Sequence, residues 1–230
     1  MAVSQYLEHP GIQIASGLVI NTSHINKFGF NPACSNDLET IWDNGGLYNY
    51  IETPGPATVT GDAQDTGAVV SVQGLDENYD AVTESVTLGG TTTANFIRVF
   101  RARLESHPSE AVNSRDITVT VDGSVRATIL RDEGQTLMAL YTIPRRTTGY
   151  LVKFQGSIDR NKEMIFKLFS RHIDNGVFNL KGQFGSYGPP VTYDYPVPLL
   201  FKEKTDIEVR ATAGGHAGAG AIFDLILVRN

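Results

Sequence analysis

Residues 74–104 read GLDENYDAVTESVTLGGTTTANFIRVFRARL, and this stretch decides the fold class. It holds two runs of alternating side chains, residues 82–88 and 96–103, which meet at Gly89-Gly90. Successive side chains of an extended strand point to opposite faces, so period-two runs rich in Val, Thr, Ile and Phe are typical of half-buried strands. Adjacent glycines readily adopt the positive φ of a tight turn. We therefore predict a β-hairpin here, and the stretch indicates no chemistry.

Similar short runs recur along the chain, separated by turns of Gly, Pro and Asn, and no convincing amphipathic helix interrupts them. This pattern predicts an all-β protein, a β-sandwich of jelly-roll-like type. Further hairpins are expected around Asp122-Gly123, around residues 159–162 and around Asn175-Gly176. Residues 191–201 are expected at a sheet edge or in a crossover because Pro196 and Pro198 donate no hydrogen bond, and the apolar residues 221–228 at a sheet centre. Residues 205–212 alternate apolar and charged side chains, which predicts a strand with one buried face.

The N-terminal part is less regular than the rest. We predict an irregular N-terminal arm over residues 1–35, with a short strand within residues 12–20 as an option, and a β-sandwich domain over residues 36–230. A sub-boundary near residues 90–94 is an alternative division. Phe28 and Phe30 are apolar anchors spaced within the arm, which either reaches a neighbouring molecule or packs over its own domain.

Composition excludes several classes of function. The net charge of −6 disfavours direct nucleic-acid binding, which needs Lys and Arg against phosphates. The compact basic cluster Arg98, Arg101 and Arg103 is interpreted as solvated charges or partners of carboxylates. The single cysteine, Cys34, excludes an intrachain disulfide and lacks the spacing of a metal site. No basic leader and no long apolar run is present, so we expect a soluble protein without a signal peptide or membrane span.

No catalytic, cofactor or metal motif emerges. Residues 76–80 place oxygen side chains as a calcium loop does, but the glycine and glutamate that such a loop needs are missing, so a polar turn is favoured. Residues 214–220, GGHAGAG, resemble a dinucleotide loop without the helix that would hold phosphate. Trp42, Tyr48 and Tyr50 gather around a turn, where aromatic side chains more often plug a β-core than stack on a sugar.

Four segments of the chain resemble virion structural proteins of marine tailed bacteriophages, such as those of cyanobacteria and Pelagibacter-like hosts. These segments are GLDENYDAVTESVTLGGTTT, GQTLMALYTIPRRTTGYL, YPVPLLFKEKTDIEVRAT and IFDLILVRN, and the likeness runs in order from Trp42 to the C-terminus. The resemblance implies a virion component assembled in the host cytoplasm. It carries over no catalytic or ligand residue.

These observations lead to three hypotheses. The first is a capsid decoration or cement protein on the head surface, a homo-oligomer, for instance a trimer, that binds the major capsid protein or another virion protein. The second is a tail or fibre component with Tyr48, Tyr50 and Tyr187 as glycan platforms. The third hypothesis, ranked below both, is a polysaccharide depolymerase. We expect that the protein is not an enzyme, uses no cofactor, and binds neither nucleic acid directly nor a membrane. The expected attachment residues are Phe28, Phe30 and Trp42, and the expected subunit contacts are Asn175, Gly176 and Tyr187.

Overall fold

The structure, a computed structural model, describes residues 10–159 and 162–230. The regular structure of the described residues is almost entirely β, apart from the helix α1 (Pro10–Ala15) and the 3-10 turn η2 (Ala63–Asp65). The strands are β1 (Thr22–Cys34), β2 (Glu39–Thr40), β3 (Gly55–Thr60), β4 (Val69–Asp76), β5 (Ala81–Thr87), β6 (Thr91–Ser106), β7 (Ile117–Val121), β8 (Ser124–Ile129), β9 (Leu140–Thr142), β10 (Thr147–Ile158), β11 (Met164–His172), β12 (Asn179–Ser186), β13 (Val191–Phe201), β14 (Thr205–Ala213) and β15 (Ala217–Arg229). No helix among these residues is long and apolar enough to cross a lipid bilayer.

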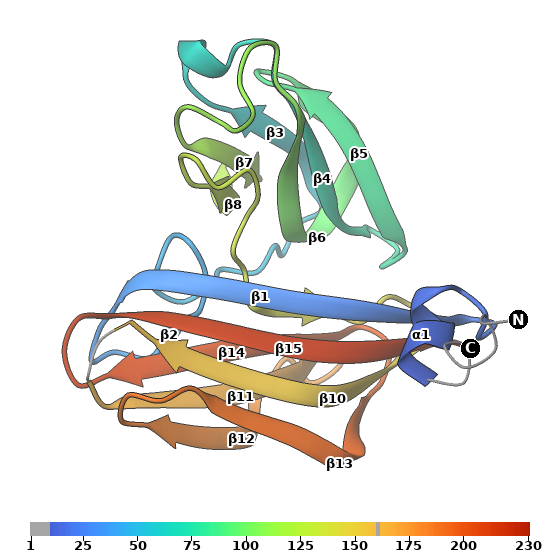
Figure 1. The fold of residues 1–230 in the computed structure, drawn as a ribbon. Coiled ribbons are helices and arrows are strands. Elements are labelled where there is room, and N and C mark those ends of the chain that lie inside the picture. The colour runs from blue at the N-terminus through green and yellow to red at the C-terminus, as the bar shows by residue number, and fades with distance from the viewer. Residues whose placement is uncertain (1–9, 160–161) are drawn as a thin grey trace, which may run out of the picture.

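Figure 1 shows two bodies, a sandwich of long strands with a smaller β-lobe above it. One sheet of the sandwich has the order β1-β15-β10-β13, and the other has the order β12-β11-β14, with β2 and β9 both paired to β14. With β2 and β9 counted as one strand, the sandwich has eight strands, arranged 1-8-3-6 and 5-4-7-2 in chain order. This arrangement is that of a jelly roll, and it confirms the predicted fold class.

One jelly-roll strand is interrupted between β2 and β9. The N–H of Ile41 donates to the carbonyl of Val209 (2.9 Å), the N–H of Val209 to that of Ala139 (3.0 Å), and the N–H of Ala139 to that of Ile41 (2.9 Å). Trp42 and Met138 form an antiparallel bridge where the chain departs and returns. Residues 42–138 are therefore an insertion within a single strand of the jelly roll.

The inserted lobe is a curled sheet with the order β5-β4-β6-β3-β7-β8. The two runs around Gly89-Gly90 do form β5 and β6, but the predicted hairpin is wrong because β4 lies between them. The start of β6 is held near β5 by a side chain, since the carboxylate of Glu84 accepts the N–H groups of Thr93 (2.7 Å) and Ala94 (3.0 Å). The alternative domain boundary near residues 90–94 falls inside this sheet.

The predicted hairpin around Asp122-Gly123 is confirmed as β7–β8, with both turn residues at positive φ. The hairpin around Asn175-Gly176 is confirmed as β11–β12. The hairpin predicted around residues 159–162 is wrong, because β10 and β11 lie in opposite sheets of the sandwich. The edge position of β13 and the central position of β15 are confirmed.

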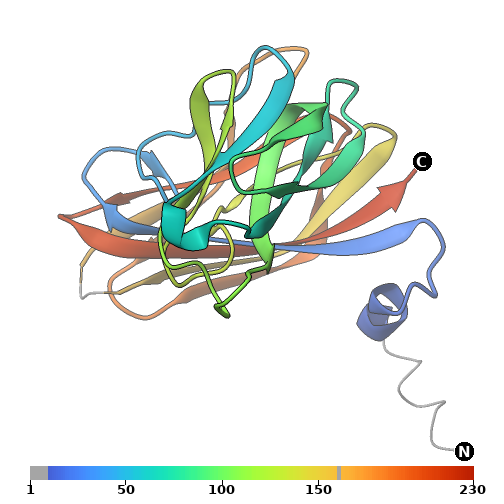
Figure 2. The ribbon, with the colours of Figure 1, turned by 90° about the horizontal axis from the view of Figure 1, so that it is seen from above.

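The irregular arm predicted for residues 1–35 is wrong over residues 22–34, which form β1 and pair with β15. The inward-facing residues of β1 are Lys27, Gly29 and Asn31, whereas Phe28 and Phe30 are only half-buried on the other face. β1 therefore lacks the inward-facing apolar side chains from which a strand is predicted, and the sequence did not indicate it. Residues 10–21 form α1, which stands clear of the sandwich (Figure 2), and a loop that is joined to it where the carbonyl of Asn21 accepts the N–H of Arg229 (2.8 Å), so the strand proposed within residues 12–20 is also wrong. Residues 1–9 lie outside the described part.

Gly29 makes the interrupted strand possible. A Cβ atom at this position would lie 2.2 Å from the N atom of Ala139 and 2.4 Å from the O atom of Ile41. Both are backbone atoms of the interrupted strand, so no side-chain rotation relieves the overlap. β1 must therefore cross this point without a side chain.

We predict that Gly29→Ala lowers the free energy of unfolding by about 3 kcal/mol or more, because the added methyl group displaces backbone in a packed core. Urea denaturation of purified protein measures the change. The control is Gly185→Ala in the exposed part of β12, where a Cβ atom meets no atom within 4 Å. Equal stability of the two variants would contradict the role of Gly29.

Candidate functional site

The junction between the lobe and the jelly roll contains buried charges. Asp206 and Glu208 of β14 are fully buried, so the prediction that residues 205–212 bury one face only is wrong. The alternation was read correctly, but the polar face lies under the lobe and its linkers instead of in water. Burial of two carboxylates requires compensating partners, because desolvation of each charge costs several kcal/mol.

Asp206 receives those partners from three separate elements. Arg98 of β6 donates from Nε (2.8 Å) and Nη2 (3.0 Å), and Arg171 of β11 donates from Nε (3.0 Å) and Nη2 (2.6 Å). The hydroxyl of Thr142 on β9 adds a third donor at 2.7 Å. One carboxylate therefore fixes the lobe, through Arg98, to the body of the jelly roll. The interpretation of Arg98 as a carboxylate partner is confirmed.

Glu208 forms a second centre next to it. Arg210 donates from Nε (2.8 Å) and Nη2 (3.2 Å), and the Tyr50 hydroxyl donates at 3.1 Å. The hydroxyl of Thr40 makes a further short hydrogen bond to this carboxylate. Burial, followed by the nearby charge of Glu208, raises the pKa of Tyr50 well above its usual range, so its hydroxyl remains a donor.

Cations and aromatic rings alternate along this junction. The series begins in the turn before β14 and ends on β11, in the order Lys204, Tyr79, Arg98, Tyr50, Arg171, Phe178, Arg210 and Phe169. Its successive cation-to-ring distances are 5.4, 5.6, 5.0, 4.3, 4.6, 4.4 and 4.9 Å. We call this series the cation–aromatic ladder. Cation–π contacts are stronger when desolvated, so the ladder adds to the ion pairs beneath it.

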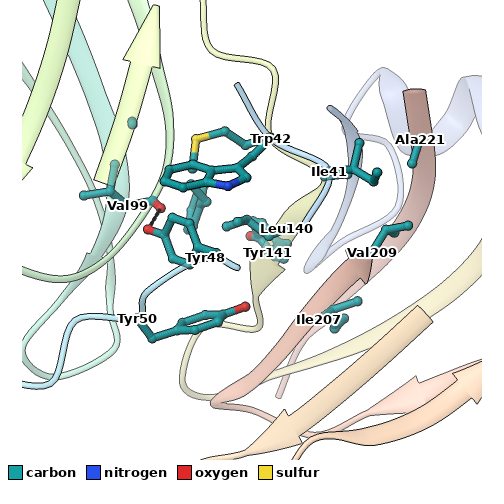
Figure 3. Packing of buried hydrophobic residues seen from close by; sticks show 14 of the residues in the cluster. Ile41, Trp42, Tyr48, Tyr50, Val99, Leu140, Tyr141, Ile207, Val209 and Ala221 are labelled. Atoms are coloured by element: carbon teal, nitrogen blue, oxygen red, sulfur yellow. Dashed lines mark hydrogen bonds between the residues drawn. The ribbon is translucent and has the colours of Figure 1, made fainter. Parts of the chain in front are cut away.

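The aromatic residues around the turn after β2 belong to the core of the junction. Trp42 contacts Tyr48 edge-on (5.0 Å between ring centroids), and Tyr48 contacts Tyr50 in the same way (4.9 Å). Figure 3 shows these three rings between Val99 of the lobe and Leu140 and Ile207 of the jelly roll, with the Tyr48 hydroxyl donating to the carbonyl of Val99 (3.0 Å). All three side chains are buried, so none presents the exposed face that Trp42 would need for attachment or that Tyr48 and Tyr50 would need as surface glycan platforms, although Tyr48 and Tyr50 do line a cavity of the junction.

A corner of the junction stores backbone strain. Tyr79, Arg146 and Lys204 come from three different turns, and each has a left-handed backbone, with φ of 64°, 55° and 57°. The N–H of Arg145 donates to the carbonyl of Tyr79 (2.9 Å), and the Arg145 guanidinium binds Asp80 (2.8 Å). A non-glycine residue in this region costs about 1–3 kcal/mol and persists only where its surroundings impose it. Such strain often marks functional sites, which makes this corner a candidate.

The β1 side of the junction holds a second pair of buried charged groups. Lys27 makes a short hydrogen bond from Nζ to the carbonyl of Phe100 in the lobe, and burial lowers the pKa of this amine well below its usual range. Asp43 accepts the N–H of Leu137 (2.7 Å) at one oxygen, while its other oxygen has no hydrogen-bond partner among the described residues. Burial raises the pKa of Asp43 to about 8.

The remaining predicted interface residues lie on the surface. Asn175 and Gly176 occupy the exposed β11–β12 turn, and Tyr187 is 74% exposed, with its hydroxyl donating to Glu163 (3.1 Å). Phe28 and Phe30 are half-buried on β1. The structure does not bring these residues together into one surface.

Apolar side chains remain exposed at the edge of the sandwich formed by β12 and β13, on the side away from the lobe (Figure 1). We call this the β12–β13 edge. Its large exposed residues are Val177, Leu180, Tyr187, Tyr193, Val197 and Leu200. The register of β13 against β10 shifts between Leu199 and Asp194, opposite Leu151 and Lys153, so Pro196-Val197-Pro198 bulges outward. Val197 is 79% exposed at this bulge.

Within the described residues, no group of three or more His, Cys, Asp or Glu side chains is placed to hold a metal ion. Asp76 uses its carboxylate to accept the N–H groups of Asn78 (2.8 Å) and Asp80 (2.9 Å), as a polar turn does. No sequence pattern indicated the assembly of Arg98, Arg171, Asp206 and Glu208, because these residues are far apart in the chain and each resembles an ordinary strand charge.

No protein-family model matches the sequence, and a search of curated proteins gives no match either. Among solved structures, the Gt strain of infectious bursal disease virus matches at 11% identity and a TM-score of 0.27, over 91% of this chain and 73% of that chain. The VP2 subviral particle of the same virus matches at 10% identity and 0.21, over 91% and 76%. A lipoprotein of Bacteroides thetaiotaomicron matches at 9% identity and 0.16, over 90% and 95%. TM-scores this low carry no argument, and the fold is assigned here from strand order.

We predict that Asp206→Asn lowers the free energy of unfolding by about 3–5 kcal/mol, because two buried guanidinium groups lose their shared counter-charge. Chemical denaturation measures the loss. The control is Asp194→Asn on β13, an exposed carboxylate 4.0 Å from Lys153, which should change stability by less than about 0.5 kcal/mol. A similar effect of both substitutions would contradict the role of Asp206 in the junction.

The raised pKa of Asp43 leads us to predict a specific pH dependence of the free energy of unfolding. Its pKa in the folded protein, about 8, lies above the ordinary value, so between about pH 4 and 8 the folded state binds one proton more than the unfolded state. The contribution of Asp43 to stability therefore falls as pH rises through this window. In Asp43→Asn this dependence disappears, and the variant should gain on the wild type by up to about 1.4 kcal/mol per pH unit.

Urea denaturation at pH 5, 6.5 and 8 tests this expectation. Asp122→Asn, in the exposed β7–β8 turn, is the matched control and should follow the wild type at every pH. Parallel profiles of Asp43→Asn and the wild type would show that Asp43 does not titrate in this way.

Proposed function

We propose that the protein is a structural component of the particle of a tailed bacteriophage, a decoration protein that binds the head surface and associates with copies of itself. The role is non-catalytic. The observation that carries the proposal is the exposure of large apolar side chains at two places on an otherwise well-packed jelly roll. Large apolar side chains left in water at one part of a surface are typical of sites that a partner covers.

The β12–β13 edge is the first of these places and suits contact with other copies. Its bulge at residues 196–198 lacks two N–H groups, which prevents simple extension of the sheet and leaves Val197 as an apolar anchor. Aromatic rings support the edge from inside, since Phe184 stacks on Phe154 (4.6 Å) and contacts Tyr193 (5.7 Å). A firm apolar protrusion on a rigid sheet is a good contact for repeated assembly.

The segment ahead of β1 is the second place and suits attachment to the head. It carries Ile12, Leu18 and Ile20 with exposed side chains, and Ile20 is 83% exposed. Its helix α1 stands apart from the sandwich (Figure 2), so this part of the segment is accessible to a neighbouring protein. This assignment narrows the predicted arm to the residues before Thr22. Phe28 and Phe30 then support β1, and the attachment contact moves to Ile12, Leu18 and Ile20.

The jelly roll and its lobe supply the rigidity that a particle component needs. Jelly rolls form viral capsid domains, lectin domains and cupins, so the fold is compatible with the proposal without deciding it. The resemblance of four segments to phage virion proteins supports the same assignment.

We predict that removal of residues 1–21 abolishes association with purified heads and leaves a folded protein, because β1 and the sheets remain complete. Co-sedimentation with heads measures binding, and the far-UV circular dichroism of a β-protein measures folding. Removal of residues 1–35 is the contrasting variant and should fail to fold, since it deletes β1. Normal loading of the protein that lacks residues 1–21 would refute head attachment through this segment.

A tail or fibre component is the second candidate, and the exposed Tyr187 in the β12–β13 loop favours it as a possible host contact. The number of copies per purified particle separates the two candidates. A number that covers a head lattice supports decoration, and a small multiple of the tail symmetry supports the tail. Loss of a polysaccharide-cleaving activity on substitution of one Asp or Glu would instead identify an enzyme.

A further inference from the structure

A cavity of about 450 Å³ opens at the junction, between the lobe and the β11–β12 hairpin. Its walls include Tyr79 and Arg98 of the lobe, Asn49 and Glu52 of the linker that leads into β3, and Arg171 and Phe178 of the jelly roll. The volume falls within the range of about 300–1,000 Å³ that small-ligand sites occupy. The cavity lies over the cation–aromatic ladder, where its walls are both charged and aromatic.

The wall carries one cation, Arg171, whose hydrogen-bond donors are not all used by the described residues, and the acidic Glu52 lies on the same wall. Arg98 and Arg171 share the single carboxylate of Asp206. Arg98 also donates from Nη1 to the carbonyls of Ile51 (3.1 Å) and Ile97 (2.7 Å), so each of its nitrogens is engaged. Arg171 uses Nε and Nη2 only, and within the described residues its Nη1 makes no hydrogen bond. A guanidinium edge of this kind is complementary to a carboxylate.

This cation is held in a fixed position. The guanidinium of Arg171 lies between the rings of Tyr50 (4.3 Å) and Phe178 (4.6 Å), and four-fifths of its side chain is buried. Partial burial strengthens its attraction for an anion, because the surroundings screen charge less than water does. The cavity therefore offers a preorganised anion site and not a mobile surface charge.

The remaining walls suit a ring that carries hydroxyl groups. Tyr79 is half-buried, its ring contacts Lys204 (5.4 Å) and Arg98 (5.6 Å), and its strained backbone points to a functional position. Asn49 and Glu52 are exposed at the rim, and in the described part of the chain their side chains make no hydrogen bond. Amide and carboxylate oxygens accept hydrogen bonds from hydroxyl groups.

We propose that this cavity binds a carboxylate-bearing sugar of the uronic acid class. The carboxylate binds Nη1 of Arg171, the ring packs on Tyr79, and the hydroxyl groups donate to Asn49 and Glu52. An acidic side chain of a partner protein supplies the same carboxylate but no hydroxyl groups for Asn49 and Glu52, so the sugar fits the site better. This binding activity goes beyond the structural role and is independent of whether the protein lies on the head or the tail.

Isothermal titration of the full chain with glucuronate, glucose, acetate and a short polyglutamate peptide tests the proposal. Glucuronate should bind at least about tenfold more tightly than glucose or acetate, because it alone satisfies both the charged and the hydroxyl-binding groups. Equal binding of acetate or of the peptide would overturn the sugar assignment in favour of a general carboxylate site. Absence of saturable glucuronate binding would overturn the site altogether.

Two variants locate the binding. Arg171→Met keeps the aliphatic stem and removes the charge, and it should weaken glucuronate binding at least about tenfold. Tyr79→Asn removes the ring and places a residue that tolerates positive φ, so the turn should fold and the binding should still be lost. The control is Arg131→Met, an exposed arginine elsewhere on the lobe, which should bind as the wild type does. Arg171 also supports Asp206, so Arg171→Met could fail to fold. In that case Tyr79→Asn is the deciding variant. Binding of glucuronate by folded Tyr79→Asn with wild-type affinity would overturn the proposal.

Discussion

The rest of the structure depends on the backbone hydrogen bonds that join Ile41, Ala139 and Val209. Through them β14 is paired as if one continuous strand lay beside it, although the chain leaves after Ile41 and returns at Ala139. An insertion whose ends meet at adjacent positions adds little strain to its host, because the host keeps its sheet hydrogen bonds. The insertion instead imposes a steric constraint on β1, which crosses this point at Gly29 with no space for a side chain. The jelly roll therefore holds the lobe at a fixed entry point, and every contact of the junction follows from that point.

The two chain segments that join the lobe to the jelly roll would by themselves leave the lobe free to rotate about its attachment. The buried charges prevent this rotation. Asp206 and Glu208 can be desolvated only while Arg98, Arg171 and Arg210 surround them, which requires one orientation of the lobe. Apolar packing would provide comparable stability but less directional constraint, since ion pairs of this geometry tolerate little displacement. The same charges leave one guanidinium edge unused, so rigidity and a potential ligand site arise from a single set of residues.

The positions of the strands could be predicted from the sequence far better than the pairing of each strand with its neighbours. Periodicity is a local property, and it located β5, β6, β10 and β11 correctly. Pairing is not local: Glu84 holds the start of β6 by its side chain, and the turn after β10 carries the chain to the opposite sheet. β1 was missed because Lys27, Gly29 and Asn31 face inward, which reverses the expected pattern. The buried carboxylates were missed for a related reason, since a sequence shows that a strand face is polar but not whether another lobe covers it.

The two functional surfaces proposed above meet at one turn of the molecule. Gly176 and Phe178 of the β11–β12 hairpin line the cavity, whereas Val177, which lies between them in the chain, is exposed and belongs to the β12–β13 edge. A neighbour that packs on Val177 therefore contacts the turn that positions Phe178, and Phe178 in turn contacts the guanidinium of Arg171. Because packed side chains transmit small displacements, a neighbour placed there by the proposed self-association would act on a wall of the cavity. Contact with other copies and binding of a ligand are thus expected to influence each other through this short segment.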